Sequence, residues 1–493
     1  MNIELQVLGS SLRSIAEEMG AVLIRSAFSA NIKERRDCST ALFDERGRMI
    51  AQAEHIPVHL GALPDAVAAV CAHDPAPDEV FILNDPYAGG THLPDITLVS
   101  RTLVGFAATR AHHADVGAYE PGSLPAGSRR LEEEGVVIPP TRLDETTLDD
   151  LTARMRSPDE RRGDLRAQLA ANRLASRRIE GLCARRGQQL VVAAMDELHD
   201  YAERRVRAAI AALPDGRFEA RDVLEAPEGD LELRAAVTIA GDELEIDFAG
   251  TAPQHDGNLN CPLAVTRSAC YFAVRCLTDP DAPASGGAFA PVTVRAPEGC
   301  LVNARPPAAV AAGNVETSSR IADVVFLAFG EAIEVPAQGQ GTMNNVTFGN
   351  DRFTYYETIG GGQGACPEAD APSAVHVAMS NTLSTPTEAL ELAYPLRVER
   401  HALRLGSGGA GRHRGGDGVV RELRALEGCR LSILSERRRR APQGRQGGEA
   451  GRPGLNLLNG LELPSKTTRD LGRGDVVRIE TPGGGGYGTK SAT

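Results

Sequence analysis

The spacing of apolar residues predicts a helix and then a β-hairpin at the start of the chain. Leucine, isoleucine and methionine recur every three or four positions over residues 3–30, which is the spacing of an amphipathic helix. Residues 40–53 contain short strand-like runs on either side of the turn signal Asp44-Glu-Arg-Gly47. We therefore expect a hairpin there, with Asp37 at its entrance. Further strands are predicted at 80–83, 96–99 and 103–108.

The next part of the chain is predicted to be helical. Residues rich in Leu, Ala and Arg have long helical periodicity at 165–177 and 190–211, and the turn Pro214-Asp-Gly216 ends this pattern. From residue 217 the apolar runs become shorter and strand-like, at 231–239 and 244–248. Two later helices are predicted at 264–277 and 321–331, the second with Thr317 and Ser318 as N-caps.

These patterns predict a mixed α/β (α+β) fold with several domains. A chain of 493 residues is too long for one ordinary core. We expect an N-terminal α/β domain at 1–216 with the long helices, a central α+β domain at 217–399 and a Gly-rich β domain at 400–493. The 52 glycines and 30 prolines agree with a fold that has many turns.

Charge argues against two classes of partner. The formal net charge of −13 disfavours nonspecific binding to nucleic acid or to an anionic membrane, because both favour a basic surface. The one basic run, Arg437 to Arg440, is short and continues into a Gly-rich loop. We interpret it as a solvated or partner-facing turn.

Cysteine usage and the N-terminus indicate the cellular compartment. The nine cysteines are scattered and include no Cys-x-x-Cys pair, so they do not make a disulfide framework. The first residues lack the basic start and apolar run of a signal peptide, and no segment has eighteen uninterrupted apolar residues. We expect a soluble, cytoplasmic protein with reduced thiols.

Two neighbouring stretches gather residues that bind metals. His92-Leu-Pro-Asp95 comes soon after one predicted strand, and His112 and His113 end another. Imidazole and carboxylate ligands suit zinc, manganese or iron. Adjacent histidines diverge on a strand, so we expect only one of this pair to bind the ion. The alternative is that all of them are hydrogen-bonded loop residues.

Other polar residues near these stretches are expected to support such a site. Asn84 and Asp85 lie at the end of a predicted strand, and Asp115 follows His113 closely enough to orient a ligand. The segment His55-Ile-Pro-Val-His59, with Glu54, offers candidates for a general base. For these three residues a purely structural role is an equally good interpretation.

The sequence contains no convincing nucleotide-binding motif. Gly406-Ser-Gly-Gly-Ala-Gly411 satisfies Gly-x-Gly-x-x-Gly, but the chain after it does not open a helix, so the βαβ context is missing. A Gly-x-x-x-x-Gly-Lys-Ser/Thr loop is also absent. If the reaction needs ATP, we expect another chain to hold it.

Longer motifs resemble the hydantoinase B/oxoprolinase family, in the same order along nearly the whole chain. The matching segments begin at Arg25-Ser-Ala-Phe-Ser-Ala-Asn-Ile-Lys-Glu-Arg-Arg-Asp-Cys-Ser, Ala51-Gln-Ala-Glu-His-Ile-Pro-Val-His, Asn84-Asp-Pro-Tyr-Ala-Gly-Gly-Thr-His-Leu-Pro-Asp, Ala111-His-His-Ala-Asp-Val-Gly, Gly250-Thr-Ala-Pro-Gln-His-Asp-Gly, Gly313-Asn-Val-Glu-Thr-Ser and Tyr355-Tyr-Glu-Thr-Ile-Gly-Gly-Gly-Gln-Gly. The resemblance implies a B-type component that works with an A-type ATPase subunit, in a hetero-oligomer that hydrolyses a cyclic amide such as a hydantoin or oxoproline.

The resemblance also implies a division of the chemistry. The A-type subunit, with ATP and Mg²⁺, would phosphorylate the substrate's oxygen, and a metal-bound water on the B-type component would then attack the activated carbon. The implied ligands are His92, Asp95 and His112, with Asp37 as a fourth. His112 is preferred to His113 because the carboxylase relatives keep only the first histidine. His55, His59 or Glu54 would accept the proton.

Two alternatives stay open at the level of sequence. The same family includes the α subunits of acetone- and acetophenone-type carboxylases, which have Gln where this chain has Leu93. That difference favours the hydrolase branch. In the second alternative the chain is a non-catalytic scaffold whose metal is structural.

Overall fold

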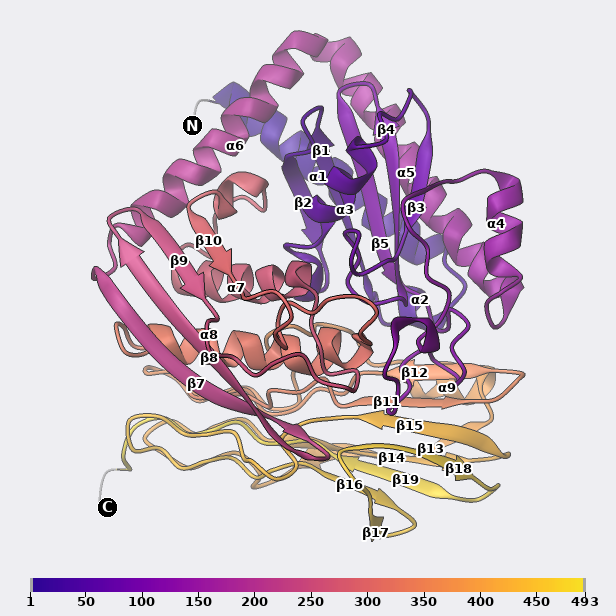
Figure 1. The fold of residues 1–493 in the computed structure, drawn as a ribbon, viewed down its shortest axis with the longest axis vertical. Helices are drawn as coiled ribbons and strands as arrows, with labels where there is room; N and C mark the ends of the chain where they lie inside the picture. Colours follow the sequence, from indigo (N-terminus) through magenta and orange to yellow (C-terminus); the bar gives the residue numbers. More distant parts are fainter. Residues whose placement is uncertain (1–2, 491–493) are drawn as a thin grey trace.

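The computed structural model describes residues 3–490, in which an antiparallel six-stranded sheet forms the N-terminal part (Figure 1). The strand order is β2-β1-β5-β4-β3-β6. Its elements are α1 Ile3–Ser26, α2 Ala30–Lys33, β1 Cys38–Asp44, β2 Met49–Glu54, η1 Pro57–His59, α3 Leu63–Cys71, β3 Val80–Leu83, β4 Asp95–Thr102, β5 Gly105–His112, η2 Leu131–Glu133, β6 Thr141–Arg142, α4 Glu145–Thr152, α5 Pro158–Arg186 and α6 Gln188–Ile210. The predicted first helix, hairpin and long helices are confirmed.

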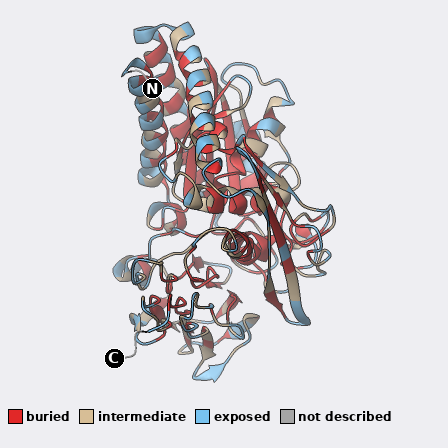
Figure 2. Cartoon of the chain, turned by 90° about the vertical axis from the view of Figure 1, so that its left-hand side faces the viewer, coloured by how far each residue is buried: buried red, intermediate tan, exposed pale blue. Residues whose placement is uncertain are grey.

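Both faces of this sheet are buried. Apolar residues of α1, α5 and α6 pack on one face, against side chains such as Leu42 and Ala107. The other face, with Ala41 and Phe43, belongs to a larger core that continues into the central part of the chain. Figure 2 shows the exposed outer sides of the long helices and the buried residues gathered between the layers. Within residues 3–490, no helix combines the length and the apolar character that a membrane span needs.

The central part has a four-stranded sheet, in the order β10-β9-β8-β7, that packs on two helices. Its elements are β7 Gly216–Ala226, β8 Gly229–Ala240, β9 Glu243–Asp247, α7 Leu263–Leu277, η3 Gly286–Phe289, β10 Val292–Arg295, η4 Gly313–Thr317 and α8 Ser318–Phe329. The predicted N-cap role of Thr317 and Ser318 is wrong, because the π-helical turn η4 leads directly into α8. Their hydroxyls instead donate to the carbonyls of Leu259 and Asn314.

Two further sheets pack face to face at the C-terminal end (Figure 1). One has the order β12-β11-β15-β18 and the other β13-β14-β19-β16-β17. The elements are β11 Asn345–Gly349, β12 Thr354–Glu357, α9 Thr387–Ala393, β13 Leu396–Arg404, β14 Gly418–Ala425, β15 Cys429–Leu434, β16 Leu455–Leu458, β17 Leu461–Glu462, β18 Lys466–Leu471 and β19 Val476–Glu480. The mixed α/β fold class is confirmed, as is the β character of the described residues beyond 400.

The first of these sheets joins strands from both sides of the predicted boundary at 399. β11 pairs with β15 along its full length, from Asn345 opposite Leu434 to Gly349 opposite Arg430. The division into three domains was drawn from changes in the sequence pattern, and it stays a prediction. In the structure, the central and C-terminal parts share a sheet.

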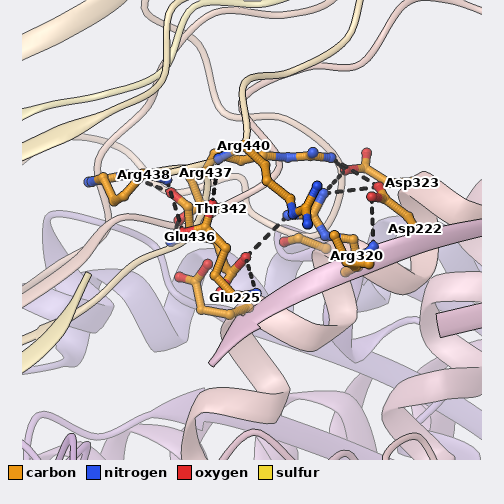
Figure 3. A network of polar contacts seen from close by, with 12 residues as sticks. Asp222, Glu225, Arg320, Asp323, Thr342, Glu436, Arg437, Arg438 and Arg440 are labelled. Carbon is orange, nitrogen blue, oxygen red and sulfur yellow. Dashed lines mark hydrogen bonds and ion pairs between the residues drawn. The ribbon is translucent and has the colours of Figure 1, made fainter. Parts of the chain in front are cut away.

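Arg437, the first residue of the basic run, is buried in a network of ion pairs, which corrects the interpretation of this residue as part of a solvated turn (Figure 3). Arg439 and Arg440, at the end of the run, are exposed and pair with Asp230. The Arg437 guanidinium lies 2.6 Å from Asp323 and 3.2 Å from Asp222. Arg320 of α8 lies 3.0 Å from Asp323 and 3.4 Å from Glu436. This network ties the C-terminal sheets to β7 and α8, so the run acts within the fold.

Glycine in the loops at 360–364, 406–416 and 482–488 allows backbones to touch. A Cβ on Gly484 would lie 1.8 Å from the Gln363 carbonyl oxygen, and one on Gly408 would lie 1.9 Å from that of Gly415. In the Gly-x-Gly-x-x-Gly pattern, Gly408 and Gly411 are thus explained by packing between loops, and Gly406 by its positive φ of 74°.

Replacing Gly484 with alanine is expected to destabilise the protein by about 1–3 kcal/mol or more, because the clash is with backbone. Urea unfolding followed by circular dichroism measures the effect. Gly181→Ala is the control, since its Cβ would meet only the flexible Arg185 side chain at 3.4 Å and alanine favours the helix α5. Equal stability of Gly484→Ala and the wild type would contradict the loop-packing explanation.

Candidate metal centre

Strands β4 and β5 bring His92, Asp95 and His112 together. His92 lies in the turn before β4, Asp95 begins β4, and His112 ends β5. Asp95 and His112 are direct partners across the two strands. The Asp95 N–H donates to the His92 carbonyl at 3.0 Å, which closes the turn and places His92 beside the other two residues.

The three side chains converge on one point inside the protein. His92 Nε2 lies 3.2 Å from His112 Nδ1, and each of these atoms lies 3.1 Å from Asp95 Oδ1. All three residues are buried. Burial alone would raise the pKa of Asp95, but His92, His59 and the hydrogen bond to His112 hold it well below its usual range.

This donor set fits a divalent metal ion. Metal–ligand bonds of about 2.0–2.1 Å in a tetrahedral arrangement place the ligand atoms roughly 3.3 Å apart, close to the separations found here. Lone pairs on two imidazole nitrogens and a carboxylate oxygen repel one another at such distances. The group therefore needs either a shared proton or a cation between these atoms. His92, Asp95 and His112 are therefore a potential metal-binding group, and their chemistry accepts zinc, manganese or iron.

Asp37 lines the same small cavity. It directly precedes β1, and the His112 N–H donates to the Asp37 carbonyl at 3.0 Å. No hydrogen bond to its carboxylate is found among residues 3–490, so this group is available to the cavity. The cavity measures about 20 Å³, which is room for an ion or one water molecule.

His59 is the general-base candidate that the structure brings to the group. Its Nε2 lies 3.4 Å from Asp95 Oδ2, and its Nδ1 lies 3.0 Å from Ser39 Oγ. A carboxylate only accepts hydrogen bonds, so the ring tautomer that suits both partners has its N–H at Nε2, facing Asp95, and accepts from the Ser39 hydroxyl at Nδ1. In this tautomer His59 orients Asp95.

His55 lies elsewhere. Its ring lines a separate cavity beside α1 and α6, and its carbonyl accepts a hydrogen bond from Asn381. Burial, with a smaller effect from Arg36, lowers its pKa. Glu54 ends β2, and its side chain lies outside the described part of the structure.

His113 points away from its neighbour His112. Its Nε2 lies 3.0 Å from the Gln168 side-chain oxygen on α5, and burial lowers its pKa to about 4. Asp115 accepts hydrogen bonds from the backbone of Gly117 and Gly122 and thus shapes the following loop. Neither side chain contacts the three converging residues through a hydrogen bond found in the described part of the chain.

Asn84 supports the turn that carries His92. Its side chain donates to the Leu93 carbonyl at 2.8 Å and accepts from the Ile138 N–H at 2.7 Å. Asp85 accepts from the Tyr87 N–H at 2.9 Å and forms a neighbouring turn. Asn84 therefore fits its predicted supporting position more directly than Asp85.

Several residues of the cavity were missed by sequence reasoning. The Tyr356 ring stacks on His112 with the centroids 4.7 Å apart. Tyr356, Thr358 and Asn314 lie within motifs that carried the family resemblance, which gave a signal without a role. Ser380 and Thr382 had no such signal.

Comparisons with known sequences show which family this chain belongs to. The family model described as hydantoinase B/oxoprolinase matches residues 1–490. Among curated relatives, 5-oxoprolinase 1 of Arabidopsis thaliana is 39% identical over 99% of this chain and 42% of its own length. The B component of a putative D-/L-hydantoinase of Pseudomonas sp. strain NS671 is 31% identical over 99% of this chain and 90% of its own length.

Two solved structures have a fold similar to that of this chain. The ATP-dependent caprolactamase from Pseudomonas jessenii is 29% identical, with a TM-score of 0.93 over 99% of this chain and 91% of that one. Nucleotide-free acetone carboxylase is 17% identical, with a TM-score of 0.87 over 99% and 75%, and shows a shared fold.

The fold and the buried His–Asp–His group define a mixed α/β protein with a potential metal centre between two strands. The chain belongs to the hydantoinase B/oxoprolinase family. It spans less than half the length of the plant 5-oxoprolinase, so the activity of that whole protein does not transfer to this chain alone.

Proposed function

We propose that this chain is the B-type component of an ATP-dependent cyclic-amide hydrolase. The observation that carries the proposal is the convergence of His92, Asp95 and His112 in a buried cavity that Asp37 also lines. The names of the relatives, which include an oxoprolinase, a putative hydantoinase and a caprolactamase, support the same class of substrate.

The residues suit hydrolysis of an activated amide. An unstrained amide is a poor electrophile, and phosphorylation of its oxygen turns that oxygen into a leaving group. A bound divalent cation would lower the pKa of a water molecule toward about 7. His92, Asp95 and His112 would hold the cation, and His59 would fix the orientation of Asp95.

Asp37 has two roles open to it in this proposal. Its carboxylate lines the cavity and accepts no hydrogen bond from the described residues, so it suits a fourth ligand or an acceptor for the proton of the attacking water. His55 lies on another cavity and is a weaker candidate for the base. A ring substrate exceeds the roughly 20 Å³ of the cavity, so its binding requires the lining segments to move.

We propose that an A-type partner supplies the ATP step. The Gly-rich loops are filled by each other's backbone and the sequence has no P-loop lysine motif. The additional length of the plant relative has room for such a second part. In this proposal the active site is divided between a phosphorylating subunit and the hydrolytic site of this chain.

The test is an assay of this chain purified with its A-type subunit. ATP-dependent phosphate release coupled to ring opening is expected for at least one member of a panel of hydantoins, oxoproline and lactams. Each reaction is run with and without bicarbonate and in parallel with ketones. Turnover that needs a ketone and bicarbonate would contradict the proposal in favour of a carboxylase, and full lactam turnover by metal-free protein would favour a scaffold.

A further inference from the structure

Arg35 is a buried cation beside the candidate metal centre. It is fully buried, and among residues 3–490 it has no carboxylate within ion-pair distance. Its guanidinium donates to the carbonyls of Tyr356 and Thr358 and to the hydroxyls of Thr358 and Thr382, the last at 2.9 Å. Its Nε has no hydrogen-bond partner among the described residues. Burying a charge is costly without a counter-charge, and neutral oxygens compensate it only in part.

The hydroxyls that Arg35 contacts line the cavity of the metal centre. Thr358, Thr382 and Ser380 all lie on its wall, together with His92, Asp95 and His112. Thr358 Oγ1 lies 2.6 Å from Thr382 Oγ1. Arg35 thus reaches the cavity through the two threonine hydroxyls, which it polarises by donating to their oxygen atoms.

His376 completes a chain of hydrogen bonds through these hydroxyls. Its Nδ1 lies 2.9 Å from Ser380 Oγ and its Nε2 lies 3.3 Å from Thr382 Oγ1. Burial, and then Arg35, lowers the pKa of His376 to about 4, so the ring is neutral near pH 7 and carries one N–H.

Counting hydrogens shows that one hydroxyl is left to donate into the cavity. The chain of groups runs from Thr358 through Thr382 and His376 to Ser380, and each group owns one hydrogen. Each contact between neighbours uses one of these hydrogens, so one group keeps its own. The neutral imidazole must use its hydrogen within the chain, because both of its nitrogens are engaged. The free donor is therefore a hydroxyl on the cavity wall.

The charges around the cavity favour a negatively charged ligand, which a free hydroxyl donor also suits. The cavity wall carries two carboxylates, Asp37 and Asp95, whose charge a divalent cation would offset. Arg35 then adds a positive charge that no described carboxylate pairs with. Tyr356 brings the two parts together, because its ring stacks on His112 and lies 5.5 Å from the Arg35 guanidinium carbon.

We propose that Thr358, Thr382 and Ser380, with Arg35 behind the two threonines, form an oxyanion-binding wall beside the metal centre. The ligand is an oxyanion group beside the cation, and its binding, like that of a ring substrate, requires the segments that line the roughly 20 Å³ cavity to move. Resting on the proposed function, it is either a phosphoryl oxygen of the activated amide or the carboxylate released by hydrolysis. Hydroxyl donors with a buried guanidinium charge behind them suit both.

The test is calorimetric titration of the metal-loaded chain with inorganic phosphate and, separately, with acetate at equal ionic strength. Losing charge-assisted hydrogen bonds is expected to weaken anion binding roughly 10- to 100-fold in Thr358→Val/Thr382→Val. Thr266→Val is the matched control, because it removes a buried hydroxyl that donates to the Val302 carbonyl away from the cavity. Metal content and circular dichroism are measured for each variant.

The two anions distinguish the source of the oxygen. Selective weakening of phosphate binding supports the phosphoryl group, and selective weakening of acetate binding supports the carboxylate. If the double variant does not fold, Ser380→Ala serves in its place. The proposal is overturned if the wild type binds neither anion, or if the wall variants bind both as tightly as Thr266→Val does. The titrations measure anion binding and do not depend on turnover. A failure of the oxyanion proposal can therefore be distinguished from a failure of the proposed hydrolase function.

Discussion

His92→Ala is expected to lose the bound metal and to reduce ATP-dependent ring opening by at least about 100-fold, since changes to groups that merely support metal ligands already cost 10- to 100-fold. The His92 ring supplies one of three converging atoms, and the remaining nitrogen and oxygen do not enclose an ion. Metal is measured by mass spectrometry after dialysis, and turnover is measured in the complex with the A-type subunit.

The matched control for this prediction is His113→Ala. His113 is also buried and lies next to a ligand candidate, but its ring contacts Gln168 of α5. This variant is expected to lose stability and to keep its metal. If both variants kept the metal, or both lost it while folded, His92 would not be distinguished as a ligand.

Arg320→Met is expected to lower the free energy of unfolding by about 3–5 kcal/mol, the usual cost of removing one member of a buried ion pair. Arg320 is fully buried and lies within 3.4 Å of Asp222, Asp323 and Glu436 (Figure 3). Methionine keeps much of the volume but removes one of the buried cations that these carboxylates share, and Arg437 is left to pair with both Asp222 and Asp323. Urea unfolding followed by circular dichroism measures the loss.

The deficit of Arg320→Met is expected to grow with pH. Burial raises the pKa of Asp323 to about 7 even with Arg320 nearby. A carboxyl with a raised pKa in the folded state favours folding when protonated, and that contribution is lost as pH rises through the folded-state value. Removing Arg320 raises the pKa further, so the deficit should be larger at pH 8 than at pH 5.5.

Arg178→Met provides the comparison for the buried network. Arg178 of α5 forms a partly exposed ion pair with Glu18 at 2.7 Å, and such surface pairs contribute about 0–1 kcal/mol. A similar loss of stability in both variants, or a deficit of Arg320→Met that does not change with pH, would contradict the role given to the network.

Local sequence patterns predicted the helices and strands well, but they did not predict which distant segments contact each other. The 3.6-residue period found α1, and the turn at Asp44 found the β1–β2 hairpin, because both depend on neighbours in sequence. The pairing of β11 with β15 was not predictable from period, since β13 and β14 lie between them in the chain. The Arg437 run looked solvated because its partner Asp222 is 215 residues away.

The same limit applies to the candidate site, where residues close in sequence were predicted and distant ones were missed. His92, Asp95 and His112 come from one turn and two paired strands, so their spacing predicted that His92 and Asp95 meet one of the two adjacent histidines, and the family resemblance favoured His112. Asp37 was placed by the adjoining strand β1 and by the family resemblance. The wall residues Thr358 and Thr382 reach the cavity from more than 240 residues further along, and their hydroxyls are common in loops.

The most direct test of the proposed metal centre is anomalous X-ray scattering from crystals of the chain purified with its metal. We expect one anomalous peak within bonding distance of His92 Nε2, His112 Nδ1 and Asp95, and no such peak in crystals of His92→Ala. Metal bound in stoichiometric amount at another place, with no peak between these three side chains, would contradict the assignment.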